Sequence, residues 1–423
     1  MHRPANGLAP PVYDVAVVGG GSAGLAAIAS LLRRRPALRI CLIEPATEHC
    51  YQPGWTLVGA GVFAQHRTVR PMASLVPDCV TWERAAAAAF EPDDNRVVLG
   101  NGAAVHYRTL VAAPGLKLDW NAVAGLRDTL GRNGVTSNYQ PGLAPYTWQL
   151  VSGLRRGRAL FTQPPMPIKC AGAPQKAMYL SADHWLRAGC LGDIRIEFHN
   201  AGAALFGVDA YVPALMAYVR KYGAHLEFGS RLVAVDGAAR VATFERAGAD
   251  GARHEEQREF DLLHVCPPQV APDCVRASPL AAASGWIEVD PYSLRHVRYE
   301  NVFALGDAIS ASNAKTAAAA RKQAPVAAEN VIAALEGKAL PAAYDGYGSC
   351  PLTVERGKIV LAEFGYGGKL LPTFPRWLID GRRPSRLAWH LKSEALPAIY
   401  WRAMLKGREW LCKPRRREAA EAR

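Results

Sequence analysis

The sequence has few cysteines, and none of them lie in the close pairs that hold a metal ion or a disulfide scaffold. Its nine cysteines are scattered over 423 residues, at positions 41, 50, 79, 170, 190, 266, 274, 350 and 412. No CxxC pair occurs, which argues against a zinc site of the usual ligand spacing. We therefore predict no metal site.

Long apolar stretches are also missing. The sequence has no run of about 18 uncharged apolar residues, the signature of a membrane-spanning helix. Residues 1–12 lack the apolar region of a secretory signal. The length of the chain is sufficient for two or three domains with large cores.

The net charge of +13 is unevenly spread. Residues 374–423 hold 13 Lys/Arg and five Asp/Glu, so this tail carries +8 and the other 373 residues carry only +5. A basic tail suits nucleic acid or an anionic membrane surface. No DNA- or RNA-binding motif accompanies the charge, so we predict no nucleic-acid partner.

The first motif is a glycine-rich turn between a strand and a helix. Residues 14–18 (DVAVV) predict a buried strand, residues 19–24 (GGGSAG) follow it, and residues 25–35 predict a helix. A second strand at residues 40–43 ends at Glu44. Such glycines let a pyrophosphate approach the helix N-terminus, and the acid can bond the adenosine ribose. The pattern predicts a dinucleotide site, and glycines used for packing alone are the alternative.

Two later segments decide between FAD and NAD. Residues 301–308 (NVFALGDA) resemble the second FAD signature of the pyridine-nucleotide-disulfide reductase superfamily, and residues 110–115 (LVAAPG) resemble its middle signature. In that superfamily the acid at Asp307 would bond the ribityl chain, whereas alone it could equally be a helix N-cap. Three signatures in the right order favour FAD.

A second glycine loop, which would bind NAD(P)H, is missing. Residues 159–162 and 193–199 predict strands and residues 175–187 a helix, but residues 163–174 (QPPMPIKCAGAP) hold prolines and Cys170 where glycines are needed. We predict a second Rossmann-like domain that does not bind NAD(P)H. Electrons must then come from another donor.

Cys170 is a candidate for that chemistry. It precedes the predicted helix, whose dipole would lower the pKa of the thiol, and Lys169 and Lys176 add positive charge. A thiolate beside a flavin would be a nucleophile. A buried, inert cysteine is the alternative reading.

Four segments carry a closer resemblance to a known family. They are residues 169–176 (KCAGAPQK), 51–61 (YQPGWTLVGAG), 344–351 (YDGYGSCP) and 396–401 (LPAIYW). Together they resemble sulfide:quinone oxidoreductases, above all the branch with the mitochondrial enzyme and its bacterial relatives. The similarity runs from residue 12 to residue 413 and so covers almost the whole chain.

The resemblance implies a redox-active pair. Cys170 and Cys350 would form a bridge of two or three sulfurs over the flavin, with Cys350 as the persulfide carrier and Cys170 facing the ring. Hydrogen sulfide would attack the bridge, and the sulfane sulfur would leave to sulfite, glutathione or sulfide. Electrons would pass through FAD to a quinone. The sequence predicts that Cys350 lies in a mobile loop between Gly348 and Pro351.

The predicted FAD site draws on all three signatures and the family resemblance. Its residues are Gly19, Gly21, Ser22, Ala23, Gly24, Glu44, Gln52, Ala113, Gly115, Gly306, Asp307, Lys315 and Thr316. Some family members attach FAD through a cysteine between the middle signature and the first active-site cysteine. Residues 116–168 hold no cysteine, so we expect non-covalent FAD.

The basic tail also carries tryptophans and an apolar repeat. Trp377, Trp389, Trp401 and Trp410 alternate with arginines, residues 387, 391, 395, 399 and 403 are apolar, and Pro397 would bend or split the helix. Such a helix can lie in the bilayer interface, although a packing or dimerisation helix is the alternative. We predict a monotopic protein of the bacterial cell membrane, on a side left open. Phe364, Tyr366 and Phe374 are candidates for the quinone path.

The sequence thus predicts an α/β protein with two Rossmann-like domains and a C-terminal membrane-associated helical segment. Residues 12–118 and 290–340 would form the FAD domain, 119–289 the second domain, 341–413 the C-terminal region and 414–423 a basic tail. The rival functions are a type II NADH:quinone reductase and a non-catalytic flavin redox sensor. A homo-oligomer remains open.

Overall fold

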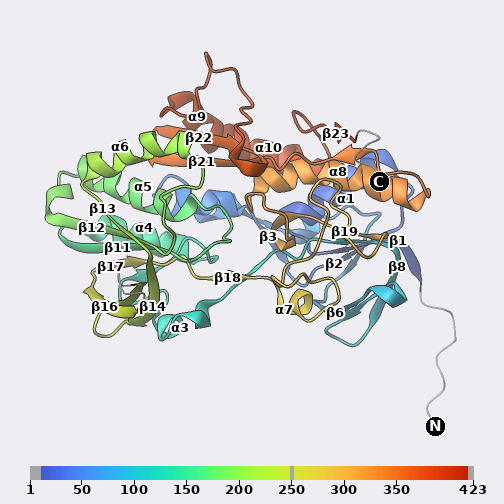
Figure 1. Ribbon diagram of the computed structural model, residues 1–423, viewed down its shortest axis with the longest axis horizontal. Helices are drawn as coiled ribbons and strands as arrows, with labels where there is room; N and C mark the ends of the chain where they lie inside the picture. Colours follow the sequence, from blue (N-terminus) through green and yellow to red (C-terminus); the bar gives the residue numbers. More distant parts are fainter. Residues whose placement is uncertain (1–10, 248–251, 418–423) are drawn as a thin grey trace, which may run out of the picture.

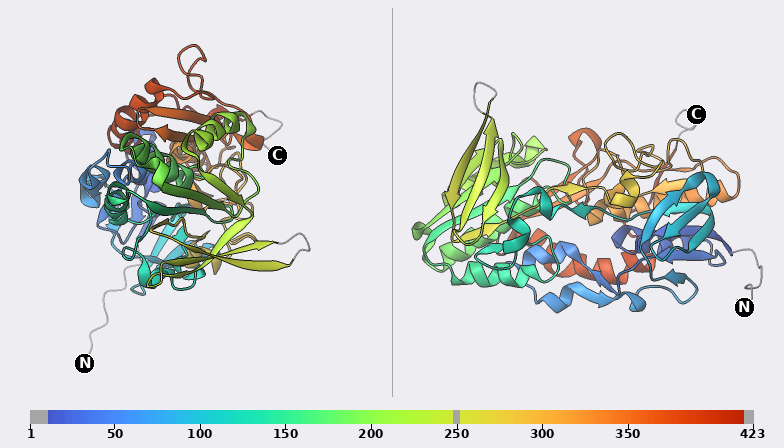
Figure 2. Two further views of the ribbon diagram at one scale, coloured as in Figure 1. Left: turned by 90° about the vertical axis from the view of Figure 1, so that its left-hand side faces the viewer. Right: turned by 90° about the horizontal axis from the view of Figure 1, so that it is seen from below.

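The computed structural model describes residues 11–247 and 252–417 and is built around two β-sheets along the long axis of the molecule (Figure 1). The first sheet lies on the right in this view and the second on the left. The C-terminal segment, in red, runs along the top of both. Figure 2 shows the same two halves from one end and from below.

The first sheet combines N-terminal strands with one strand from late in the chain. In spatial order its strands are β5 (Thr81–Glu83), β2 (Ile40–Ile43), β1 (Val12–Val18), β8 (Ala104–Ala112), β7 (Arg96–Leu99) and β6 (Ala87–Glu91), and β19 (Val302–Ala304) pairs with β8. The pairs β5–β2, β2–β1, β1–β8 and β8–β19 are parallel. Helices α1 (Ser22–Arg34) and α8 (Ala317–Leu335) pack against each other beside this sheet.

The second sheet is parallel throughout. Its strands are β10 (Val135–Thr136), β17 (Leu262–His264), β11 (Gly157–Gln163), β12 (Ile194–Asn200) and β13 (His225–Phe228). The helices that accompany them are α4 (Leu143–Gly153), α5 (Ala173–Arg187) and α6 (Val212–Tyr222). An antiparallel sheet of β14 (Ser230–Asp236), β15 (Val241–Ala247) and β16 (Arg253–Glu259) lies beside it.

Short elements connect and cover the two halves. The ladder of β9 (Lys117–Leu118) with β18 (Gln269–Val270) lies where the chain passes between the sheets (Figure 1). The remaining short elements are α2 (Trp55–Val58), α3 (Leu126–Thr129), α7 (Asp273–Arg276), and the paired strands β3 (Glu48–Cys50) with β4 (Val69–Pro71) and β20 (Ala342–Ala343) with β23 (Arg415–Arg416).

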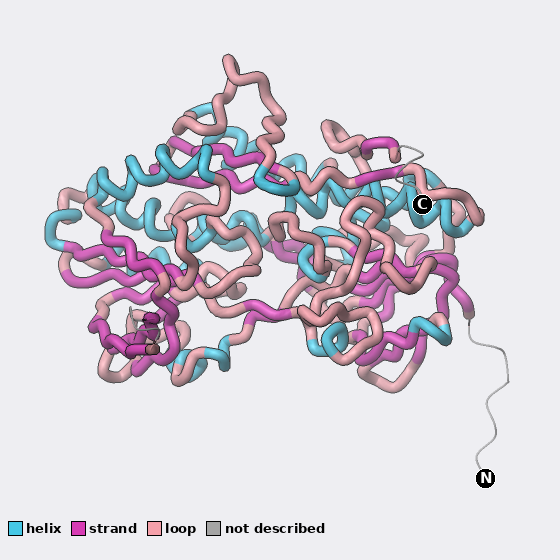
Figure 3. Tube along the Cα trace, in the orientation of Figure 1, coloured by secondary structure: helices cyan, strands magenta, loops and turns pink. Residues whose placement is uncertain are grey.

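The C-terminal region begins with a hairpin and ends in a helical segment. Strands β21 (Gly348–Glu355) and β22 (Lys358–Phe364) form the hairpin, which packs on α5. A long loop that rises from the top of the molecule separates it from α9 (Arg386–His390) (Figure 3). A π-helical turn, Leu391–Ala395, joins α9 to α10 (Leu396–Arg402).

Local structure agrees closely with the sequence predictions in both Rossmann-like halves. The strand predicted at residues 40–43 is β2, and the helix predicted at 175–187 is α5, which begins two residues earlier. The predicted helix 25–35 is α1, which begins at Ser22 and ends at Arg34. Hydrophobic runs followed by helical periodicity therefore located these elements correctly.

The tail helix differs from the prediction. Residues four apart advance slightly more than one helical turn, so the predicted apolar row winds around the helix from exposed Leu387 to buried Ala403. Trp401 is 5 % exposed and packs into the body of the protein, whereas Trp377 and Trp410 are 84 % and 62 % exposed. No helix in residues 11–247 and 252–417 is long and apolar enough to cross a membrane.

The last part of the predicted basic tail cannot be placed, because residues 418–423 lie outside the described residues. The part before it is structured. Arg415 and Arg416 form strand β23 against β20, and Arg416 pairs with Glu329 of α8. At least this portion of the tail is therefore attached to the first half of the molecule.

Candidate active site

The glycine-rich turn joins β1 to α1 at the edge where the parallel strands of the first sheet end. Gly19 has a φ of +98°, and a Cβ on it would lie 2.3 Å from the carbonyl oxygen of Ala113. A Cβ on Gly24 would lie 1.8 Å from the carbonyl oxygen of Gly19, so neither position accommodates a side chain. The space beside Gly21 is open, which leaves room for an anionic ligand at the N-terminus of α1.

Glu44 follows β2 and contacts the same turn. Its carboxylate accepts hydrogen bonds from the backbone N–H groups of Gly20 at 2.6 Å and Ala46 at 2.7 Å. The carboxylate predicted to bind the ribose therefore also holds the glycine turn in place.

A buried polar chain that the sequence did not indicate ties the C-terminal helix α10 to this turn. The Tyr400 hydroxyl lies 2.7 Å from the Ser22 hydroxyl and 2.6 Å from His49 Nε2, and His49 Nδ1 lies 3.0 Å from the carbonyl oxygen of Gly20. Burial lowers the pKa of His49. The residues involved are far apart in sequence, so no local pattern could have revealed the chain.

The second FAD signature follows β19. The backbone N–H of Gly306 donates to Gln323 Oε1, and the Thr316 hydroxyl caps α8 by accepting from the N–H of Ala319. Lys315 donates to the carbonyl oxygens of Asp307 at 2.6 Å and Ile309 at 2.9 Å. Burial lowers the pKa of Lys315 to about 8.

Asp307 has a perturbed carboxyl group. Burial raises its pKa, while the positive charges of Lys315 and Lys169 act in the opposite direction. A carboxyl group in such surroundings gains from a ligand that donates hydrogen bonds. This matches the ribityl contact that the sequence predicts for Asp307.

The two FAD signatures meet at one edge of the first sheet. A Cβ on Gly306 would lie 2.8 Å from Cβ of Ala23 in the first turn of α1. Ala113 and Gly115 follow β8, which lies between β1 and β19. Two helix N-termini, an open glycine turn and a buried acid thus converge, and this set fits a flavin dinucleotide.

Cys170 and Cys350 lie together although 180 residues separate them in the chain. Their sulfur atoms are 4.0 Å apart. Cys170 has a φ of +51°, and its backbone N–H donates to the carbonyl oxygen of Lys315 at 2.8 Å. Positive φ is uncommon for a residue with a side chain, and strain of this kind is often found at functional sites. The contact with Lys315 places the cysteine pair beside the predicted flavin site.

Cys350 does not lie in the mobile loop that the sequence predicted. It is part of β21, opposite Ala362 of β22, and is 1 % exposed. Glycine and proline near a cysteine suggested a turn, but backbone pairing and packing on α5 outweigh that local preference. Cys170 is the more accessible of the two.

Lysines surround the cysteine pair. Lys176 Nζ lies 3.1 Å from Cys170 Sγ. The Cys350 thiol and then Lys176 and Lys392 hold the pKa of Cys170 well below its usual range, whereas the pKa of Cys350 is raised by Cys170 and by burial. This arrangement makes Cys170 the better leaving group of the pair.

Lys392 was missed by sequence reasoning because it lies in the basic tail, where its charge looked like one of many. It belongs to the π-helical turn between α9 and α10, a feature common at functional sites. The side chain is 4 % exposed and donates to the carbonyl oxygen of Pro53 at 2.8 Å. Burial, with the repulsion of Lys176, lowers its pKa to about 7.

Lys169 contacts Gln52 and not Cys170. Its Nζ lies 2.5 Å from Gln52 Oε1, and its backbone N–H donates to Gln269 Oε1. Burial lowers the pKa of Lys169, while the charge of Asp307 opposes this. Lys169 and Gln52 therefore belong to the flavin side of the site. Cys266, which had no assigned role, packs next to them, and burial raises its pKa to about 12.

The three candidates for the quinone path do not come together. Phe364 packs in the hydrophobic cluster that contains the cysteine pair. Tyr366 lies against the first half, and Phe374 packs in a separate cluster under α9. Spacing along the chain did not reveal this, because the hairpin and the following loop direct the side chains to different neighbours.

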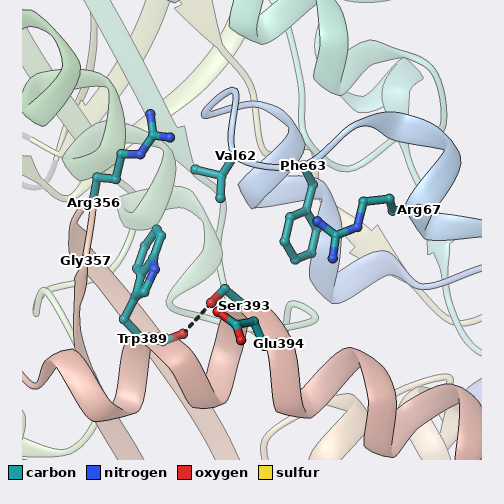
Figure 4. A pocket seen from close by; sticks show the side chains of 8 residues that line it. All are labelled: Val62, Phe63, Arg67, Arg356, Gly357, Trp389, Ser393 and Glu394. Atoms are coloured by element: carbon teal, nitrogen blue, oxygen red, sulfur yellow. Dashed lines mark hydrogen bonds between the residues drawn. The ribbon is translucent and has the colours of Figure 1, made fainter.

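A cavity of about 300 Å³ opens beside the cysteine pair. Its lining, shown in Figure 4, consists of Val62, Phe63, Arg67, Arg356, Gly357, Trp389, Ser393 and Glu394. Ser393 adjoins Lys392, and the charge of Lys392 acts on the Cys170 thiol. Among the described residues no acid lies within ion-pair distance of Arg67 or Arg356. The cavity is therefore suited to a small anion.

Comparison with known proteins places the chain. No family model matches it. It is 37 % identical over 406 residues to the mitochondrial sulfide:quinone oxidoreductase of Dictyostelium discoideum, covering 95 % of this chain and 88 % of that protein. The chain belongs to the sulfide:quinone oxidoreductase family. The mouse mitochondrial family member is 35 % identical over 407 residues, covering 96 % of this chain and 89 % of that protein.

The fold agrees with this family. The crystal structure of the sulfide:quinone oxidoreductase from Aquifex aeolicus superposes with a TM-score of 0.75 at 18 % identity, covering 93 % of this chain and 92 % of that one. Family membership makes the chain an oxidoreductase. The prediction of a bacterial cell membrane is wrong, because the similar family members are mitochondrial proteins of eukaryotes.

Proposed function

We propose that this chain oxidises sulfide to sulfane sulfur and passes two electrons through FAD to a quinone, with Cys170 and Cys350 as the catalytic pair. One observation carries the proposal: the two sulfurs lie 4.0 Å apart, with Lys176 Nζ 3.1 Å from one of them. The family membership supports the choice of substrates. The three-part division predicted from the sequence, at residues 12–118 with 290–340, 119–289 and 341–413, is part of the proposal.

The chain's own residues account for the sulfur chemistry. Attack of hydrosulfide on the Cys350 sulfur of a Cys170–Cys350 bridge breaks the sulfur–sulfur bond. It leaves a persulfide on Cys350 and an electron pair on Cys170, whose thiolate Lys176 stabilises. Transfer of the sulfane sulfur to a nucleophilic acceptor leaves a Cys350 thiolate. Re-forming the bridge from two thiolates then releases two electrons.

FAD, when bound, supplies the two-electron acceptor for this step and donates to quinone. The glycine turn and the N-terminus of α1 would hold its pyrophosphate, and Glu44 the adenosine ribose. Asp307, Gln52 and the N-terminus of α8 would lie at the flavin end. We expect non-covalent binding, because no cysteine occurs in residues 116–168.

The cavity beside Lys392 gives the sulfur acceptor an approach. Arg67 and Arg356 lie at its walls without acidic partners among the described residues, and Lys392 and Lys176 lie deeper. Successive positive charges draw a small anion inward. We infer that the acceptor is anionic, such as sulfite, a thiolate or hydrosulfide itself.

Exposed apolar side chains indicate where the quinone reaches the protein. Trp377, Leu378, Leu387, Trp410 and Leu411 are exposed, and all belong to the C-terminal region. Basic residues accompany them, as in proteins that lie on a bilayer. We propose peripheral association with a membrane through this region, which would bring a lipid-soluble quinone to the enzyme.

Anaerobic addition of sulfide tests the proposed function. We expect sulfide to bleach the flavin absorbance within the mixing time and a short-chain quinone to restore it. NADH should have no effect, because the turn after β11 lacks the glycines that an NADH site needs. Bleaching by NADH but not by sulfide would favour a type II NADH:quinone reductase, and no response to either would favour a redox sensor.

Replacing the two arginines of the cavity is expected to weaken acceptor use. In Arg67→Gln/Arg356→Gln we expect the KM for sulfite to rise about tenfold or more, because each charge-assisted hydrogen bond contributes about 1.5–3 kcal/mol. The rate of sulfide-dependent bleaching should change little. Steady-state kinetics with varied sulfite would measure this. The control is Arg155→Gln/Arg156→Gln, which removes two exposed charges elsewhere; an equal rise in KM there contradicts the assignment.

A further inference from the structure

A second, larger cavity lies outside the catalytic site. It has a volume of about 910 Å³ and lies between helices α1 and α8 and the segment that follows α10. Arg33 comes from the last turns of α1 and Lys322 from α8. The other lining residues are Arg408, Glu409, Trp410, Leu411 and Lys413. The segment lies on the side of the molecule along which the C-terminal region runs, at the top of Figure 1.

The lining of this cavity is strongly basic. It contains four Lys/Arg side chains and a single acid, Glu409. The acid is already engaged, since Glu409 pairs with Arg34 at 2.5 Å and accepts from the Ser30 hydroxyl at 2.5 Å. Within residues 11–247 and 252–417, none of the four basic side chains has an acid within 4 Å. Like charges held together in this way repel, and a bound anion would remove that cost.

The backbone of the segment is fixed while its apolar side chains point outward. Arg33 donates to the carbonyl oxygen of Gly407 at 2.7 Å, and Arg321 donates to that of Trp410. Leu411 has a φ of +56°, a conformation that is costly for a leucine. Trp410 and Leu411 are nevertheless 62 % and 69 % exposed. The strain thus presents two large apolar side chains beside a basic cavity.

We propose that this cavity binds the phosphate group of an anionic phospholipid, with Trp410 and Leu411 inserted beside its acyl chains. Basic cavities at a membrane surface bind phospholipid head groups, and tryptophan favours the interfacial region of a bilayer. Arg33, Lys322, Arg408 and Lys413 supply the donors. A free phosphate compound offers the same anionic group, but it would not explain the adjacent pair of exposed apolar side chains.

Vesicle flotation of the full-length, FAD-loaded protein tests the proposal. The vesicles are phosphatidylcholine alone or with phosphatidylglycerol or cardiolipin. In Lys322→Gln/Arg408→Gln/Lys413→Gln we expect binding to the anionic vesicles to fall about 100-fold, since each basic residue near the surface contributes about 1 kcal/mol. Binding to phosphatidylcholine alone should not change. The matched control, Arg132→Gln/Arg155→Gln/Arg156→Gln, removes the same charge from the second half.

Three further readings separate the alternatives. Equal losses in the cavity variant and the control would overturn the proposal, because general charge attraction would then explain the binding. Inorganic phosphate or glycerophosphate that displaces the protein from vesicles at micromolar concentration would assign the cavity to a free phosphate. Brominated anionic lipid should quench fluorescence in the wild type more than in Trp410→Phe, and equal quenching would contradict the insertion of Trp410.

The outcome is independent of the sulfide chemistry. With a water-soluble quinone analogue and no vesicles, sulfide-dependent turnover of the cavity variant should equal that of the wild type. Failure of sulfide oxidation in both proteins would count against the proposed function and leave the lipid site standing. Loss of turnover only in the cavity variant would show that the cavity serves catalysis, contrary to the inference.

Discussion

Cys170→Ser and Cys350→Ser are each expected to lower sulfide-dependent quinone reduction by about 10³-fold or more, since residues that act as one catalytic unit lose nearly all activity when either is removed. FAD should remain bound, because neither side chain belongs to the glycine turn or to the acids that would hold the cofactor. Turnover with sulfide and a short-chain quinone measures the first effect, and the flavin absorbance of the purified protein measures the second.

The double variant distinguishes a pair from two separate residues. If the cysteines act together through one bridge, Cys170→Ser/Cys350→Ser should be no slower than either single variant. Cys79→Ser and Cys274→Ser are the controls, and both should retain wild-type turnover. Substantial activity in Cys350→Ser would mean that Cys170 reacts without a partner, which the proposed chemistry does not allow.

Lys176→Met should raise the pKa of the Cys170 thiol by about one unit or more, because it removes an ammonium group in direct contact with the sulfur. A group with a lowered pKa is a thiolate above that pKa, so the variant needs a higher pH to reach the same thiolate fraction. The rate of alkylation of Cys170 in the reduced protein, followed against pH by mass spectrometry of its peptide, measures the shift. Turnover near pH 7 should fall about tenfold for each unit.

Lys176→Arg separates charge from packing. It retains the positive charge near Cys170, so most of the shift should disappear, although the ammonium contact at 3.1 Å is lost. Lys392→Met should have a smaller effect than Lys176→Met on the same pKa, since Lys392 acts without a hydrogen bond to the sulfur. An unchanged alkylation profile in Lys176→Met would show that the lysine does not control this thiol.

Several site residues were correctly located by sequence because their chemistry is local. The turn from Gly19 to Gly24 follows a strand and opens a helix, so its geometry is contained within a few residues. Asp307 directly follows β19 for the same reason. Lys176 was identified as a charge near Cys170, and it lies there because both residues adjoin the first turn of α5.

Other features depend on contacts that no local pattern records. Lys392 comes from a helix more than 200 residues beyond Cys170, and only the packing of the C-terminal region brings its charge to the cysteine pair. Tyr400 reaches the glycine turn in the same way. Phe364, Tyr366 and Phe374 looked like one group because they are close in sequence, yet their side chains pack in three different clusters.

The sequence by itself determined the order of strands and helices, the flavin signatures and the family, because short-range periodicity and fixed spacings encode them. Only the tertiary structure decided that Cys350 is a buried strand residue, that Lys392 faces the cysteines, and which tail tryptophans are exposed. The physical reason is the range of the interactions. A turn or a helix forms from neighbours in the chain, whereas the pKa of a thiol and the exposure of an indole depend on whatever the folded chain places beside them.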